Sequence, residues 1–195
     1  MRRLVLAAAL AALAPALAQE GGPTTRPTEP EKKPPGKVTT PAGLVLTGQE
    51  GWEPREAKGM RVAQWNLPKA EGSKDAELAV FHFQGGAGGV EANMERWLGQ
   101  FTQPDGKTSK EVAKRSQKDV AGLKVHLVDL TGTYVAESRP GSGLRVNEPD
   151  SRLLGAIVEG PNGQQHFIKL IGPAATLKKW EKSFEAFIDA LRQEG

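Results

Sequence analysis

The chain has 195 residues, with 26 basic and 23 acidic side chains and no cysteine. The absence of cysteine excludes disulfide scaffolds, thiol catalysis, lipoprotein anchors and cysteine-ligated metal sites. The length allows one ordinary domain or two small ones, and with only 6% aromatic residues and ample glycine and proline we expect a compact β-rich unit joined to non-globular sequence.

Residues 1–18 have the three-part layout of a secretory signal peptide. Two arginines precede an apolar run from Leu4 to Leu17, and small residues surround a cleavage position after Ala18. The run is shorter than the ~20 residues that a membrane-spanning helix needs. We therefore predict export to the periplasm or the exterior, with no stable membrane insertion after cleavage. The alternative is an N-terminal anchor that stays attached.

Residues 19–37 contain five prolines, three glycines and no large apolar side chain. Such a segment cannot bury enough surface to offset its ordering entropy, so we predict a disordered, Pro-rich linker. The alternative is a docking ligand for an aromatic groove on another protein. Of the three excess positive charges, two belong to 1–18 and one to the linker, so the remaining domain is neutral. A neutral domain without a basic run argues against nucleic-acid binding.

The folded domain, predicted over 38–195, begins with β-rich sequence. Two short runs of β-favouring residues, Met60–Leu67 and Ala76–Phe83, predict a hairpin. Apolar residues then recur on one helical face from Val90 to Phe101. Residues 102–109 predict a turn-rich connection, which a polar strand over Val112–Lys118 follows.

A long strand is predicted over 122–135, where alternation of apolar and polar residues is clear. Gly132 weakens this strand and can mark a bulge. The next segment, 136–150, is rich in proline, glycine and charge, and it predicts an exposed loop.

The clearest hairpin joins Arg152–Glu159 to Gln165–Ile171 through the turn Pro161-Asn162-Gly163. A strongly amphipathic helix follows from Pro173 to Leu191. Two amphipathic helices and about five to seven mostly antiparallel strands predict an α+β domain with its helices packed on the sheet.

Four local motifs follow one another along this domain in a particular order. They are Gly51-Trp52 near its start, Gly132-Thr133-Tyr134 in the long strand, a late hairpin that ends in Lys169–Pro173, and Ser183-Phe184 in the last helix. This order resembles the PsbP-like fold, and the stretch GGAGGVEANMERWLGQF looks closest to uncharacterised secreted bacterial members of that superfamily. The resemblance implies an α/β/α sandwich with an antiparallel sheet and a binding or assembly role without catalysis. It transfers no functional residues to this chain.

A glycine cluster lies between the second predicted strand and the first predicted helix; it consists of Gly85, Gly86, Gly88 and Gly89. Free amides and the helix dipole favour anions at such a place. However, the cluster lacks the Lys-Ser/Thr of a P-loop, and Glu91 would repel a phosphate. A tight crossover from strand to helix is the alternative interpretation.

Three histidines, His82, His126 and His166, each lie in the middle of a predicted strand. If these strands were neighbours and the side chains shared a face, the three rings could form a zinc site of the kind that metal-dependent hydrolases use. Parity argues against this, because His82 shares a face with apolar Leu78 whereas His126 shares one with Lys124. The histidines are therefore weak candidates for metal ligands.

No other pattern predicts catalysis or a cofactor, since the serines lie in no Gly-x-Ser-x-Gly elbow. The favoured hypothesis is a non-enzymatic binding module of the cell envelope, whose partner is an unidentified protein or small ligand. The expected contact surface combines the loop Ser138–Asp150, including Arg139 and Arg145, with the glycine cluster. Separately, Trp52 could lie in a groove and contact a ligand or peptide, although packing across a sheet edge is the alternative. The competing hypothesis is an envelope hydrolase that uses the histidines.

Overall fold

The computed structural model describes residues 36–84, 87–137 and 142–194. All of them belong to one unit of the chain, 32–195. The predicted signal peptide, most of the predicted linker, Gly85, Gly86 and Arg139 lie outside the described residues. Within the described ranges, no helix is long and apolar enough to cross a bilayer.

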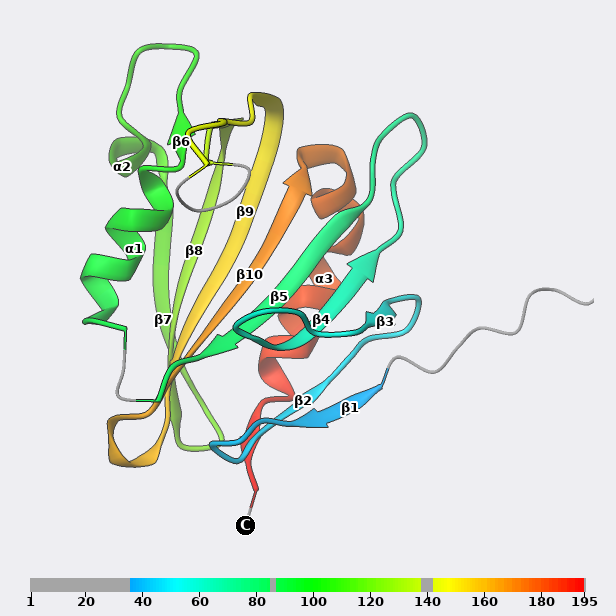
Figure 1. Ribbon diagram of the computed structural model, residues 1–195, viewed down its shortest axis with the longest axis vertical. Coiled ribbons are helices and arrows are strands. Elements are labelled where there is room, and N and C mark those ends of the chain that lie inside the picture. The colour runs from blue at the N-terminus through cyan, green and yellow to red at the C-terminus, as the bar shows by residue number, and fades with distance from the viewer. Residues whose placement is uncertain (1–35, 85–86, 138–141, 195) are drawn as a thin grey trace, which may run out of the picture. The chain divides into compact units, whose positions relative to one another are not determined.

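An eight-stranded antiparallel sheet forms the centre of the domain (Figure 1). The strand order is β3-β4-β5-β10-β9-β8-β6, and β7 also pairs with β8. The strands are β3 (Glu53–Arg55), β4 (Arg61–Leu67), β5 (Ala76–His82), β6 (Phe101–Thr102), β7 (Lys114–Val120), β8 (Leu123–Tyr134), β9 (Glu148–Glu159) and β10 (Gln165–Pro173). The sheet confirms the predicted antiparallel α+β class, with more strands than the sequence indicated.

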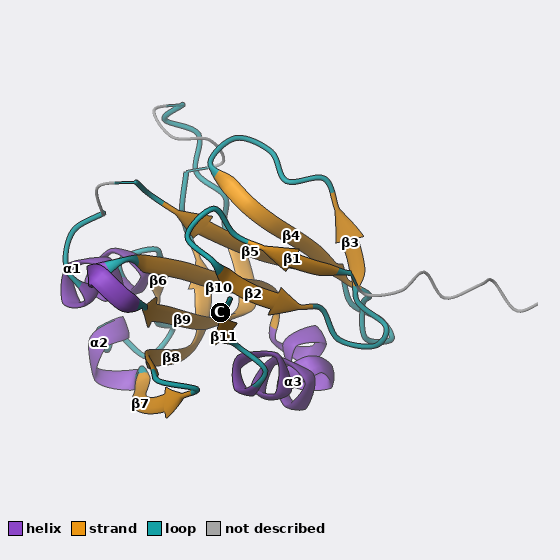
Figure 2. Ribbon diagram, turned by 90° about the horizontal axis from the view of Figure 1, so that it is seen from below, coloured by secondary structure: helices purple, strands orange, loops and turns teal. Residues whose placement is uncertain are grey.

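Helices cover both faces of this sheet (Figure 2). One face carries α1 (Val90–Leu98) with the short α2 (Ser109–Val112), and the other carries α3 (Ala174–Asp189). A second, three-stranded sheet of β1 (Lys37–Thr39), β2 (Leu44–Thr47) and β11 (Arg192–Gln193) contributes to the hydrophobic cluster on the α3 face. The arrangement is helix, sheet, helix, as the resemblance implied.

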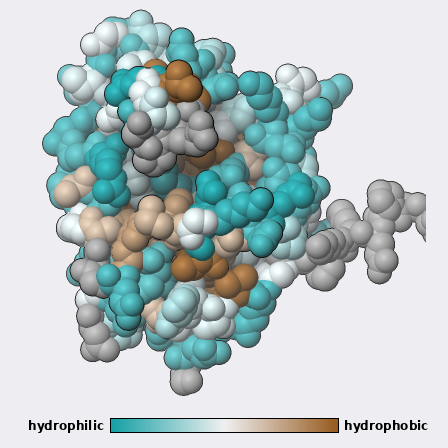
Figure 3. All heavy atoms as spheres, viewed as in Figure 1, coloured by the Kyte–Doolittle hydropathy of each residue, from teal (hydrophilic) through white to brown (hydrophobic). Residues whose placement is uncertain are grey.

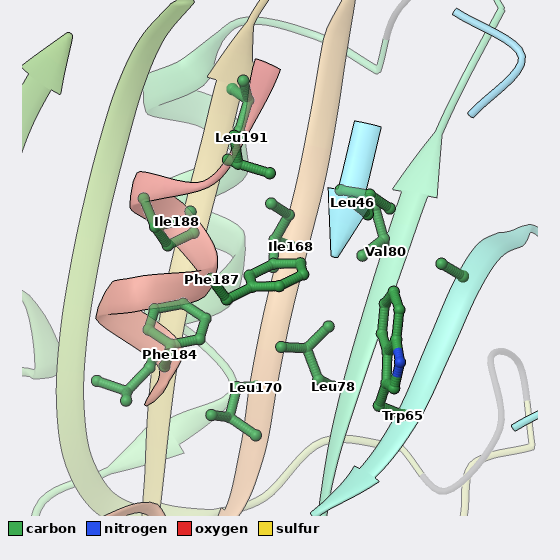
Figure 4. Close-up of a cluster of buried hydrophobic side chains, with 14 of the residues drawn as sticks. Leu46, Trp65, Leu78, Val80, Ile168, Leu170, Phe184, Phe187, Ile188 and Leu191 are labelled. Atoms are coloured by element: carbon green, nitrogen blue, oxygen red, sulfur yellow. The ribbon is translucent and has the colours of Figure 1, made fainter. Parts of the chain in front are cut away.

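The larger hydrophobic cluster lies between α3 and the sheet (Figure 4). Phe187 of α3 is fully buried, and its ring centroid lies 5.8 Å from that of Trp65 on β4. Ile168 and Leu170 of β10 point from the central strand into the same cluster. The period of three to four residues in α3 and of two in the strands brings these side chains together, as the sequence predicted.

A smaller cluster lies between the sheet and α1, and Gly155 of β9 has a specific place in it. A Cβ atom on Gly155 would lie 2.7 Å from the Trp97 ring and 2.8 Å from Val128 Cγ1. The missing side chain therefore lets the Trp97 ring approach the sheet backbone.

We expect Gly155→Ala to lower the free energy of unfolding by about 2 kcal/mol, because neither Trp97 nor Val128 can move without disturbing the cluster. Gly99→Ala is the control: its Cβ would make an ordinary 3.5 Å contact with the Glu95 carbonyl, and we expect a change within about 0.5 kcal/mol. Urea unfolding of both variants measures the difference. Equal stability of the two variants would contradict this account of Gly155.

Several boundaries differ from the predictions. The first helix ends at Leu98, because the Gln100 amide bonds to the Trp97 carbonyl, three residues back, at 3.1 Å instead of continuing the i to i−4 pattern, and Phe101 then starts β6 beside Tyr134. The predicted turn over residues 161–163 is a short 3-10 helix, since Pro161 fits the first position of a helical turn. The predicted irregularity at Gly132 is confirmed by a register shift between β8 and β9.

Candidate functional site

A charged groove runs between α3 and the strands β7, β8 and β9. It consists of two hollows, of about 240 Å³ and about 460 Å³, that share Lys114, Asp129 and Arg152 in their lining. We call it the Arg152 groove. Together the hollows reach the size range of small-ligand sites, which is about 300–1,000 Å³.

Arg152 holds the centre of the groove although it is only 9% exposed. Its Nε and Nη2 donate to the two carboxylate oxygens of Asp129, each at 2.8 Å, and Nη2 also donates to Glu181 Oε1 at 2.6 Å. Lys178 Nζ donates to the other oxygen of Glu181 at 2.8 Å. The third nitrogen, Nη1, forms no hydrogen bond with any described residue and is not among the enclosed unpaired atoms. The guanidinium is thus fixed in orientation by two carboxylates and keeps one nitrogen free.

These contacts keep the network ionised. Hydrogen bonds from Lys178 and Arg152 lower the pKa of Glu181 to about 2. The hydrogen bond with Asp129, followed by that with Glu181, raises the pKa of Arg152 above its ordinary value. Arg152 and Glu181 therefore keep their charges across the physiological range of pH.

The rest of the lining combines apolar side chains with charges on opposite walls. Leu127 of β8 and Leu154 of β9 form part of the sheet side, and Phe184 and Ile188 belong to α3. Because α3 residues 181, 184, 185 and 188 recur every three or four positions, one helical stripe forms this wall. A ligand with both apolar and charged groups would match these walls.

Among the further hollows on the domain, two differ in their lining. One, of about 640 Å³, is lined by Tyr134, Ile171 and the beginning of β9. The other, of about 470 Å³, surrounds Glu77, which accepts hydrogen bonds from Arg61 at 2.9 Å and Gln64 at 2.7 Å. Neither lining includes a charged side chain as enclosed as Arg152, so the Arg152 groove is the stronger candidate.

The face that carries α1 is mostly hydrophilic, with hydrophobic side chains in small separate patches (Figure 3). In the described ranges, two large hydrophobic residues are exposed: Met60 at 68% and Leu144 at 64%. Neither residue by itself forms an apolar surface as large as those that mark a docking face.

The structure does not bring the three histidines together. His82 and His166 are register partners on β5 and β10, with stacked rings whose centroids lie 4.7 Å apart. They share the α3 face with Ile168, whereas His126 shares the α1 face with Val128 and bonds to Glu159 Oε2 at 2.8 Å. Among the described residues, no group of three or more His, Cys, Asp or Glu side chains could hold a metal ion.

In the described part of the glycine cluster, the side chain of Asn93 bonds to the backbone carbonyls. Gly89 caps α1, and Asn93 Nδ2 donates to the carbonyl of Ala87 at 2.9 Å and to that of Gly89 at 3.0 Å. Glu91 in the first turn pairs with Arg115 at 2.7 Å. Asn93, fully buried, is a residue that the sequence analysis missed, and its contacts correspond to the crossover interpretation.

The described parts of the expected contact surface lie near opposite ends of α1. Gly88 and Gly89 precede the N-terminus of α1, whereas Arg145 belongs to a segment tied to its far end, where the Val135 amide bonds to the Gln100 carbonyl at 2.8 Å. A nine-residue helix separates the two by about 13 Å. The rest of this predicted surface, Gly85, Gly86 and residues 138–141, lies outside the described residues.

Trp52 lies in the core, not in an open groove. It is 1% exposed, its Nε1 donates to Ser183 Oγ at 3.1 Å, and its ring centroid lies 5.2 Å from that of Phe187. The indole thus satisfies its polar group inside the protein and offers no contact to a partner.

Comparisons with known proteins concern the fold alone. No protein-family model matches the sequence, and no curated protein does. PA94 from Pseudomonas aeruginosa, a protein of unknown function, is similar in structure with a TM-score of 0.47 and 13% identity, over 74% of this chain and 98% of its own. PsbP from the cyanobacterium Synechocystis is similar with a TM-score of 0.46 and 11% identity, over 78% of this chain and 87% of its own.

A cyanobacterial PsbP is among the structures that are similar to this fold. The order of elements in this sequence resembles that of the PsbP-like class. The eight-stranded antiparallel sheet between helical layers is the architecture expected of that class. No functional role is transferred from a residue of either protein to a residue of this chain.

Proposed function

We propose that this chain is a non-enzymatic binding module of the cell envelope and that the Arg152 groove is its binding site. The envelope location is an expectation from the N-terminal sequence. The groove is supported by one observation above all, the fixed and enclosed guanidinium of Arg152 at the junction of two hollows.

A buried ionic network contributes little net stability compared with apolar residues of similar volume. The network of Arg152, Asp129 and Glu181 is therefore poorly explained by stability alone. Strongly shifted pKa values beside a hollow are, in contrast, typical of binding sites. A guanidinium already held in place also loses little entropy when a ligand binds.

The competing hypothesis of a metal-dependent hydrolase requires the three histidines to converge. His126 lies on the opposite face of the sheet from His82 and His166. No observation on the described residues therefore favours this second function.

We expect Lys114→Glu to abolish binding by the Arg152 groove, because it reverses an exposed charge that lines both hollows. Lys182→Glu is the matched control, since Lys182 is exposed on α3 but outside the groove lining. Both changes are at exposed positions, so each should alter the free energy of unfolding by less than about 0.5 kcal/mol.

The measurement is quantitative capture from an envelope fraction of the source cell with the native chain and the two variants. We expect the native chain and Lys182→Glu to retain the same components and Lys114→Glu to lose them at least tenfold. Equal retention by all three proteins would reject the Arg152 groove as the binding site.

A further inference from the structure

The charged side chains that line the smaller hollow of the Arg152 groove differ in whether they have an ion-pair partner. Most are paired within the protein: Arg152 with Asp129 and Glu181, Arg115 with Glu91, and Lys118 with Asp189 at 2.5 Å. Lys114 and Glu185 line the same hollow and form no ion pair with any described residue. Both are exposed.

These two charges lie on different walls. Lys114 projects from β7, the outermost strand at this edge of the sheet, and Glu185 projects from α3. The apolar part of the lining consists of the partly exposed Leu127 of β8, beside the buried Phe184 and Ile188 of α3. The hollow thus offers one available cation, one available anion and an apolar contact at Leu127.

From this arrangement we infer that the Arg152 groove binds a zwitterion with an apolar body, namely a short apolar peptide with free amino and carboxyl termini. The ligand carboxylate pairs with Lys114, and the free Nη1 of Arg152 is a second donor near it. The ligand ammonium pairs with Glu185, and the ligand's aliphatic side chains contact the partly exposed Leu127. This inference rests on the proposed function, to which it adds the class of ligand.

Charge complementarity is what selects this occupant. A ligand with a carboxylate alone would pair with Lys114 but leave Glu185 unpaired. A ligand with an ammonium alone would pair with Glu185 but leave Lys114 unpaired. Only a molecule with both charges matches both walls, because specificity follows from complementary charges across the interface.

The test uses three related probes in calorimetric titrations of the full chain. Leucyl-leucine carries both charges, N-acetyl-leucyl-leucine lacks the ammonium, and leucyl-leucine amide lacks the carboxylate. We expect the native chain to bind leucyl-leucine about tenfold more tightly than either capped probe, as the loss of one charged hydrogen bond predicts.

Two variants assign the charges to their partners. Lys114→Gln should lose most of the preference for leucyl-leucine over its amide, with only Arg152 Nη1 left to favour the carboxylate, and Glu185→Gln should bind leucyl-leucine and its acetylated form equally. Lys182→Gln, at an exposed position outside the groove, should keep the discrimination of the native chain. The three proteins should unfold at the same urea concentration.

Failure of this inference is distinguishable from failure of the proposed function. If leucyl-leucine does not bind, or if the capped probes bind as tightly, the zwitterion assignment is wrong. If Lys114→Glu nevertheless loses captured components, the groove remains the binding site for another class of ligand. If the probes and the capture experiment both fail, both proposals are overturned.

Discussion

Replacing Asp129 by leucine is expected to lower the free energy of unfolding by about 3 kcal/mol, the lower end of the range for breaking a buried ion pair. Arg152 would keep only Glu181 as a carboxylate partner while its side chain stays 11% exposed. The cost arises from a buried guanidinium that loses two hydrogen bonds of 2.8 Å. Urea unfolding measures it as a shift of about 1.5 M in the midpoint.

The control for this prediction is the double variant Arg152→Met with Asp129→Leu. Removing both charges leaves no unpaired guanidinium, and apolar residues of similar volume fill the space, so we expect the double variant to be more stable than Asp129→Leu alone. If the double variant were as unstable as the single variant, packing rather than charge would explain the loss.

Acidification from pH 6.5 to pH 4 is expected to remove about 3 kcal/mol of stability through His166 alone, at 1.36 kcal/mol per pKa unit. Burial, together with the charge of nearby His82, lowers the pKa of His166 to about 4. His166 is 2% exposed, and its Nε2 lies 2.8 Å from Thr40 Oγ1. Below pH 6.5 the unfolded chain therefore binds a proton that the folded chain does not, and folding is opposed.

Two variants separate the loss of stability due to His166 from the loss due to carboxylates. His166→Phe should remove most of the loss between pH 6.5 and pH 4, because no group with a depressed histidine pKa remains at that position. His82→Phe should keep most of it, since burial is the larger cause. Glu181 also contributes stability, because folding lowers its pKa from the ordinary 4.5 to about 2, and this contribution is lost only as the pH falls below 4.5. An unchanged loss in His166→Phe would contradict the assignment.

The sequence predicted the elements whose signal is local. The helix α3 and the pair β9 and β10 were predicted because their periodicity is continuous over many residues. The small sheet of β1, β2 and β11 was missed, because it joins the two ends of the domain through strands of two to four residues. Helix α2 was also missed, although Thr108 and Glu111 form a capping box that the sequence displays.

The Arg152 groove could be predicted only in part. Asp129 falls on the same face of β8 as Val125 and Leu127, and Arg152 falls on the same face of β9 as Leu154. A charged residue on an apolar face of each strand was therefore visible as a signal. The register of β8 with β9 and the place of Glu181 on α3 were not, because they depend on pairing between distant segments.

The most direct test of the Arg152 groove as the binding site is a map of amide chemical shifts while leucyl-leucine is added to the isotopically labelled chain. We predict that the largest changes fall on β7 around Lys114, on Asp129 and Arg152, and on α3 from Glu181 to Ile188. Residues around Tyr134 and around Glu77, which line two other hollows, should stay unchanged. Changes confined to either of those hollows would contradict the account.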